Sequence, residues 1–187
     1  MSANLTGIAI IGKNNEPLYL RNCSGDEEQN HRSSDENAAK EEGDRDPFGF
    51  SHSLSDPRCS MPLQLQLVAY AALDSLDEVL VTGQTKQQPV IKKSNSSMPN
   101  WVGLLLELDE QAVYGYVSAT NIKYLALTKG RSEVKVMHAF LKEIHQHFIS
   151  YVMNPFANTR GPITSTLFDE QVRKSVERVQ KPELVVD

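Results

Sequence analysis

Apolar residues recur every three or four positions along the stretch from Val134 to Val179, the most regular pattern in the chain. Its first part predicts an amphipathic helix of about five turns, because this spacing places apolar side chains on one helical face. That face consists of Met137, Leu141, Ile144, Phe148 and Val152. Asn154 stands before Pro155, and a residue before proline is sterically disfavoured in the helical region, so the helix is expected to end there.

A second helix is predicted after this turn. Ser165 or Thr166 can cap its start, because a side-chain oxygen there accepts a hydrogen bond from a free backbone N–H. Its apolar stripe comprises Leu167, Phe168, Val172, Val176 and Val179. We expect three aromatic residues around the turn to anchor the helix pair on a sheet, namely Phe148, Tyr151 and Phe156. Two helices joined in this way point to a scaffold, since the pattern forces no catalytic group into position.

Shorter runs rich in β-branched and aromatic residues predict strands. They cover residues 5–11, 17–20, 101–108, 112–118 and 122–128. Residues 63–80 read as a helix, and its expected apolar face consists of Leu65, Ala69, Ala72, Leu73, Leu76 and Leu80. The predicted order is therefore ββαβββαα. Helices that interrupt and follow an antiparallel sheet give an α+β fold of two or three layers.

Two polar segments interrupt this pattern. Residues 22–61 hold 10 of the 24 acidic and 4 of the 19 basic residues, which leaves 14 acidic against 15 basic elsewhere. Because large apolar side chains are scarce there, we expect a disordered acidic insertion within a single domain spanning residues 1–187. Residues 81–100 form a second polar loop. A nearly neutral body with an acidic loop offers no basic face for nucleic acid.

Five short pieces carry a resemblance to a known family. They are IAIIGKNNEPLYL at residues 8–20, AALDSLDE at 71–78, VYGYVSAT at 113–120, MNPF at 153–156 and STLFDEQV at 165–172. In this order they resemble the sedlin family of the transport protein particle (TRAPP) tethering complex. The resemblance covers about two thirds of the chain. The chain departs from the family in its extra segment at residues 22–61 and in its longer loop at 81–100.

The resemblance implies a longin-like fold, a five-stranded antiparallel sheet with one helix on one face and two on the other. It also implies a non-catalytic adaptor subunit of the vesicle-tethering complex, supporting assembly of a Rab guanine-nucleotide exchange complex. The implied partners are other TRAPP subunits and, through the complex, a Rab GTPase and membranes. The implied location is cytoplasmic and peripheral, at ER–Golgi and Golgi membranes. No run of about 18 apolar residues or leader pattern is present, so we expect neither secretion nor a membrane span.

Two rival functions are weighed against this one. A regulatory longin domain of a SNARE-type protein would need a heptad-bearing helix and a membrane anchor after the domain, which the sequence after the last predicted helix does not show. A small hydrolase or nucleotide-binding enzyme would need a catalytic or phosphate-binding motif. Gly7 to Lys13 has the spacing G-x-x-x-x-G-K, but its middle residues form a strand, Asn14 follows, and no helix begins there.

The predicted metal and cofactor content is none. His138, His145 and His147 lie on one predicted helix, but His138 and His145 are seven residues apart and cannot share one ion. We interpret these histidines as solvated or groove-lining residues.

One stripe of the helix at residues 63–80 combines a tyrosine with three carboxylates, Tyr70, Asp74, Asp77 and Glu78. Their spacing of four, seven and eight places them on one side of the helix. An ordinary solvated face and a partner-docking stripe both fit, and the resemblance favours docking because Asp74 falls in the motif AALD. A general acid/base pair fits poorly, because an open helix surface leaves both carboxylates at ordinary pKa values.

Overall fold

A computed structural model describes residues 3–24, 61–82, 100–158 and 161–181 of the chain. The described strands are β1 (Leu5–Ile11), β2 (Pro17–Asn22), β3 (Trp101–Leu108), β4 (Gln111–Val117) and β5 (Lys123–Lys129). The helices are α1 (Leu63–Thr82), α2 (Val134–Val152) and α3 (Thr166–Gln180). The predicted order ββαβββαα is confirmed.

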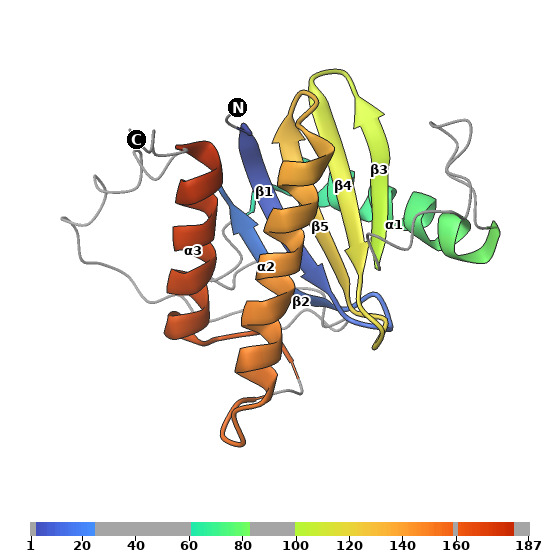
Figure 1. Ribbon diagram of the computed structural model, residues 1–187. Coiled ribbons are helices and arrows are strands. Elements are labelled where there is room, and N and C mark those ends of the chain that lie inside the picture. The colour runs from blue at the N-terminus through green and yellow to red at the C-terminus, as the bar shows by residue number, and fades with distance from the viewer. Residues whose placement is uncertain (1–2, 25–60, 83–99, 159–160, 182–187) are drawn as a thin grey trace, which may run out of the picture.

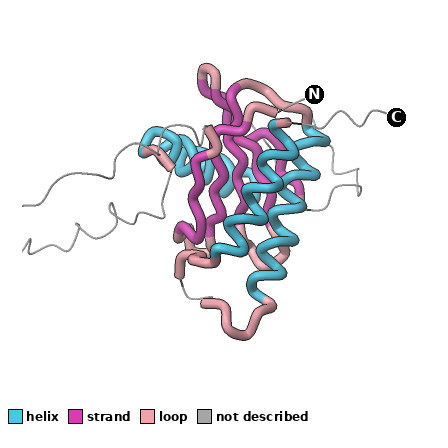
Figure 2. Tube along the Cα trace, turned by 90° about the vertical axis from the view of Figure 1, so that its left-hand side faces the viewer, coloured by secondary structure: helices cyan, strands magenta, loops and turns pink. Residues whose placement is uncertain are grey.

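The five strands form one antiparallel sheet in the order β2-β1-β5-β4-β3. Pairing of the first strand with the last brings the two halves of the chain together at the centre. Helix α1 lies on one face of the sheet, and α2 and α3 lie on the other (Figures 1 and 2). The predicted α+β, longin-like architecture, with one helix on one face and two on the other, is therefore confirmed.

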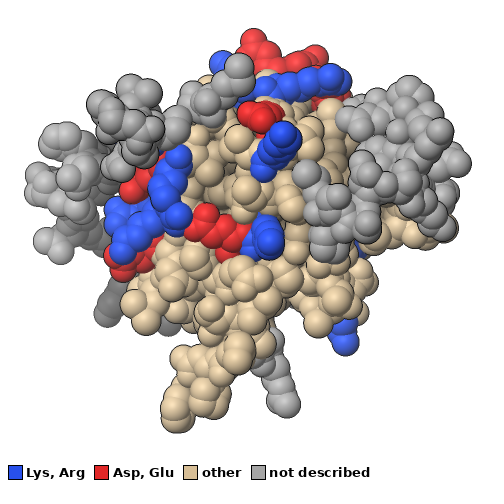
Figure 3. Space-filling model, in the orientation of Figure 1, with Lys and Arg blue, Asp and Glu red and all other residues tan. Residues whose placement is uncertain are grey.

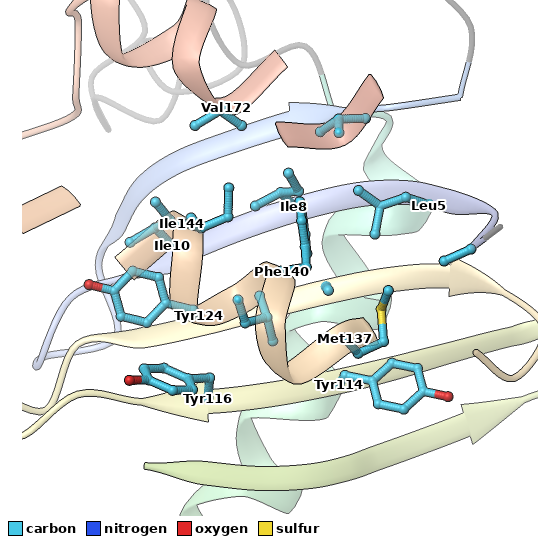
Figure 4. Packing of buried hydrophobic residues seen from close by; sticks show 14 of the residues in the cluster. Leu5, Ile8, Ile10, Tyr114, Tyr116, Tyr124, Met137, Phe140, Ile144 and Val172 are labelled. Carbon is cyan, nitrogen blue, oxygen red and sulfur yellow. The ribbon is translucent and has the colours of Figure 1, made fainter. Parts of the chain in front are cut away.

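Each face of the sheet has its own apolar core, because neighbouring residues of a strand point to opposite faces. Ile8 and Ile10 of β1 face α2 and α3, where they meet Phe140 and Ile144 (Figure 4). Ala9 and Ile11, between and beyond them, face α1. Both faces of β1, β4 and β5 are buried, which explains why these strands are apolar at nearly every position.

The ends of the two predicted polar segments take part in the fold. Asn22 ends β2, and Met61 is buried against the core on the α1 face. Helix α1 extends two residues past its predicted end. The acidic insertion and the second polar loop otherwise fall at residues 25–60 and 83–99, which lie outside the described part of the chain.

Four apolar residues that we expected to be buried are exposed, and one of them is Val152 at the end of α2, which is 42% exposed. Leu80 of α1 is half exposed, and Leu167 in the first turn of α3 is largely exposed. Phe156 does not anchor the helix pair on the sheet, because 93% of it is exposed. Phe148 and Tyr151 do pack against the core, although each remains partly exposed.

The connection between the two C-terminal helices follows the predicted signals. Helix α2 ends at Val152, just before the Asn-Pro step. The N–H of Phe168 donates to Ser165 Oγ at 3.3 Å, so Ser165 rather than Thr166 caps α3. The N–H of Ile163, in the same connection, donates to the carbonyl of Leu18 at 2.8 Å and so ties it to the outer edge of β2.

Candidate docking surface

Three of the four predicted stripe residues point away from the sheet. Tyr70, Asp74 and Glu78 are exposed on the outer side of α1. The opposite side of the helix is buried in the core, at positions that include Leu73 and Leu76. The predicted exposure of Asp74 is confirmed, while the role of the stripe remains a prediction.

Asp77, the fourth residue, turns toward the sheet. Its Oδ1 accepts a hydrogen bond from Lys123 Nζ at 2.7 Å, and the Lys123 side chain is only 4% exposed. Lys123 also donates to Asn15 Oδ1, in the turn between β1 and β2. Because a buried ammonium needs an anionic partner, Asp77 joins α1 to β5 and to this turn. Its carboxylate is therefore already engaged within the subunit.

The outer side of α1 carries apolar residues that the sequence interpretation missed. Leu63 and Leu67 are 60% and 61% exposed, and Val81 is 86% exposed. Together with Tyr70 and Asp74 they follow the spacing of three and four residues that defines one helical stripe. Helix α1 is thus apolar on the side facing the sheet and on much of the side facing solvent. We call residues Leu63, Leu67, Tyr70, Asp74, Glu78 and Val81 the α1 outer stripe.

A helix that is apolar on two sides is typical of one that is covered on both. The outer stripe adds two carboxylates, Asp74 and Glu78, in its second half. Aromatic and aliphatic residues beside a few charges are the usual composition of a specific protein interface. The arrangement is therefore suited to binding a protein.

The segment from Gly7 to Lys13, which has the spacing of a phosphate-binding loop, leads into a turn that contains the carboxylate of Glu16. Residues 7–11 lie in β1, and Lys13 lies in the turn that leads to β2. In that turn the N–H of Asn14 donates to Glu16 Oε2 at 2.8 Å. A side chain at Gly12 would collide with the same carboxyl group. The amide of Asn14 is therefore engaged by a carboxylate within the turn, and the turn is a hairpin connection between β1 and β2.

The three histidines of α2 contact neighbouring side chains. The ring of His138 packs edge-on against Trp101, with ring centroids 5.4 Å apart. His145 Nδ1 lies 3.1 Å from the hydroxyl of Tyr116. Burial lowers the pKa of His145, and burial together with the charge of Lys142 lowers the pKa of His138. In the described part of the chain, no three metal-ligating side chains lie close enough to hold an ion.

A serine, a histidine and a glutamate meet between α2 and α3. Ser175 Oγ donates to Glu143 Oε1 at 2.8 Å and lies 3.1 Å from His147 Nε2. The same ring nitrogen is 3.4 Å from Glu143 Oε1. A catalytic triad needs its carboxylate on the other ring nitrogen and its serine within reach of substrate, whereas Ser175 is fully buried. This cluster therefore links two helices.

Across the ranges that the structure covers, every helix is too short or too polar to cross a bilayer.

Comparison with known proteins gives a consistent result. A family model described as Sedlin matches residues 10–178. A Dictyostelium discoideum protein named "Trafficking protein particle complex subunit 2-like protein" is 25% identical over 90% of this chain and 94% of its own length. A Rattus norvegicus protein of the same name is 21% identical over 92% and 96%. The Schizosaccharomyces pombe "Transport protein particle 20 kDa subunit" is 24% identical over 60% and 72%. Because the family model covers most of the sequence, this chain belongs to the sedlin family.

Proposed function

We propose that this chain is a non-catalytic adaptor subunit of a TRAPP-type vesicle-tethering complex. It contributes surfaces to the assembly, and nucleotide exchange on a Rab GTPase is an activity of the whole complex. In this proposal the subunit is cytoplasmic and meets ER–Golgi and Golgi membranes only through the complex. The relatives named as subunits of such a particle support this function, since the chain aligns with nearly their full length.

The observation that carries the proposal is the α1 outer stripe. Leu63, Leu67 and Val81 expose apolar surface beside Tyr70 and Asp74 on a helix whose other side is in the core. Burying apolar surface stabilises an interface by roughly 25 cal/mol per Å², and aromatic residues often dominate binding. We therefore assign this stripe as the contact with a neighbouring subunit.

Within the stripe, Asp74 and Glu78 supply charge between the apolar surface of Leu63, Leu67 and Tyr70 and that of Val81. Charges at an interface fix its register and exclude wrong partners more than they add affinity. A neighbouring subunit is therefore expected to present an apolar strip that includes one or more basic side chains opposite Asp74 and Glu78. Asp77 has a different role: its bond to Lys123 fixes α1 on the sheet and so holds the stripe in place.

Affinity purification of the tagged full chain, with identification of the recovered proteins by mass spectrometry, tests this function. We expect several subunits of a tethering complex in comparable amounts, and a native mass well above 20.9 kDa. Recovery of the chain as a free monomer, or in association only with proteins unrelated to vesicle tethering, would contradict the proposal.

A further inference from the structure

The connection between α2 and α3 projects from the body of the protein and exposes apolar side chains. Met153 is 77% exposed and Phe156 is 93% exposed, with half-exposed Val152 beside them. Figure 1 shows this connection extending below the sheet, and in Figure 3 the described part of the projection is tan, without Lys, Arg, Asp or Glu. Single exposed apolar residues are ordinary on protein surfaces, but three within five positions on a projecting turn form a patch.

Hydrogen bonds hold the turn in one shape. The N–H of Phe156 donates to Asn154 Oδ1 at 3.0 Å, and the N–H of Ala157 donates to the Asn154 carbonyl at 3.0 Å. The hydroxyl of Tyr151 closes the loop by donating to the carbonyl of Asn158 at 2.8 Å. Phe156 is thus held outward by a backbone that is already ordered. A group ordered before binding loses little entropy on binding, which raises its contribution to affinity.

The charge of the turn narrows the kind of partner. Residues 144–158 contain no Lys, Arg, Asp or Glu, and Arg160 is the single charged residue between Met153 and Ser165. Proteins that bind anionic membranes through a surface segment use clusters of several basic residues, and a strongly charged protein surface would call for several opposite charges, whereas this connection holds one charged residue. An uncharged, apolar pocket is the surface that complements Phe156 and Met153.

We propose that Phe156, supported by Met153 and Val152, is an anchor that enters an apolar pocket on a neighbouring protein. This inference rests on the proposed function for the existence of an assembly, and it adds a second contact to it. Figures 1 and 2 show the turn well apart from α1, which covers the other face of the sheet. One partner can therefore occupy the α1 outer stripe while another holds the turn, and the subunit bridges the two.

Photocrosslinking from position 156 tests the anchor. Phe156 is replaced in the full chain by p-benzoylphenylalanine, the chain is irradiated in its native assembly, and the crosslinked peptide is sequenced. We expect one partner protein, crosslinked at apolar residues. The same group at Leu108, a half-exposed residue at the end of β3, should not give this product. A crosslink only to a second copy of this chain, or to no protein, would overturn the proposal.

The identity of the crosslinked protein separates this proposal from the proposed function. If it is a tethering subunit, both stand. If it is an unrelated protein crosslinked through an apolar pocket, the anchor stands and the tethering function fails.

Variants measure the strength of the contact. In pull-downs without crosslinking, Phe156→Ser should lower recovery of the partner identified above about tenfold, as truncation of an interface anchor does. Phe156→Leu should keep most of that recovery. Leu108→Ser is the matched control and should change nothing. Equal recovery with Phe156→Ser would overturn the anchor. A second result would also contradict it. If the isolated chain sediments with phosphatidylcholine–phosphatidylserine vesicles and Phe156→Ser abolishes this sedimentation, the turn is a membrane contact.

Discussion

Lys123 and Asp77, which are 46 residues apart in the sequence, form an ion pair with 2.7 Å between Nζ and Oδ1. The lysine is almost wholly buried, whereas 43% of the aspartate side chain is exposed. The pair places the second half of α1 against β5. It also explains why one carboxylate of an otherwise exposed stripe serves the fold of the subunit.

Removing the Asp77 carboxylate should therefore lower the stability of the fold. Asp77→Ala leaves a buried ammonium without its anionic partner, and we expect the free energy of unfolding to fall by about 2 kcal/mol in urea denaturation. Asp74→Ala, three residues earlier on the exposed side, should change it by less than about 0.5 kcal/mol. Adding Lys123→Met to Asp77→Ala should restore most of the stability. Equal effects of the two single variants would show that Asp77 is an ordinary surface residue.

The aromatic residues of α2 and its following turn should show a graded series. Phe140 is 1% exposed, so Phe140→Ala should lower the free energy of unfolding by about 3–5 kcal/mol. Phe148 packs edge-on against Tyr124 but remains partly exposed, so Phe148→Ala should cost less. Phe156→Ala should cost less than about 0.5 kcal/mol. Guanidinium denaturation of the three variants gives the ranking, and a large loss with Phe156→Ala would show that the turn is packed.

These three residues also show what the sequence could predict. The spacing of apolar residues predicted both C-terminal helices, and the strand at residues 101–108 has its predicted bounds. The spacing did not show whether an apolar residue beyond the end of a helix faces the core. Phe156 was expected to be buried because of its chemistry, but its place in a projecting turn decides its exposure.

The α1 outer stripe was predictable only in part, because helical spacing shows which residues share a face but not which face meets the sheet. Tyr70 and Asp74 were identified because a polar stripe stands out on an apolar helix. Leu63 and Leu67 have the same spacing, yet their exposure depends on which side of α1 meets the sheet. The bond between Asp77 and Lys123 depends on the packing of α1 against β5, and helical spacing carries no information about such a distant partner.

Acid should weaken the fold through the histidines of α2. Burial lowers the pKa of His145 below its ordinary value of 6.5, so the unfolded chain takes up a proton before the folded chain does. The stabilising effect of a neutral His145 is complete above pH 6.5 and is lost as pH falls from there toward its folded pKa. We expect lower urea midpoints at pH 5.5 than at pH 7.5, and a smaller difference in His145→Gln. If the urea midpoint of His145→Gln falls by the same amount between pH 7.5 and pH 5.5, the loss of stability in acid comes from other groups.

Asp169 joins the first turn of α3 to β2. Its Oδ1 accepts hydrogen bonds from Arg21 and from the hydroxyl of Tyr19, both at 2.6 Å. Partial burial opposes ionisation of this carboxyl, but the two hydrogen bonds outweigh it and hold its pKa below the ordinary value. Asp169→Ala should lower the free energy of unfolding, measured by urea denaturation, by about 1 kcal/mol. The loss is this small because half of the Asp169 side chain is exposed to solvent.

Glu170 provides the matched control for Asp169. It pairs with Lys174, one turn along the solvent side of the same helix. Glu170→Ala should leave the free energy of unfolding almost unchanged. A loss as large as that of Asp169→Ala would mean that the effect comes from the charge of the helix end and not from the contact with β2.

The central claim is that the α1 outer stripe holds a neighbouring subunit, and charge reversal at Asp74 tests it most directly. Asp74→Lys and Glu177→Lys each reverse one exposed carboxylate, on α1 and on α3 at the opposite face of the sheet. Both isolated variants should melt within about 2 °C of the parent, because exposed charges contribute little to folding.

In quantitative pull-downs from cells, Asp74→Lys should lower recovery of at least one neighbouring subunit by tenfold or more, since breaking a desolvated charge contact costs roughly 2–5 kcal/mol. Glu177→Lys should recover the same subunits as the parent. Full recovery with Asp74→Lys, at unchanged melting temperature, would contradict the account and leave the stripe an ordinary solvated helix face.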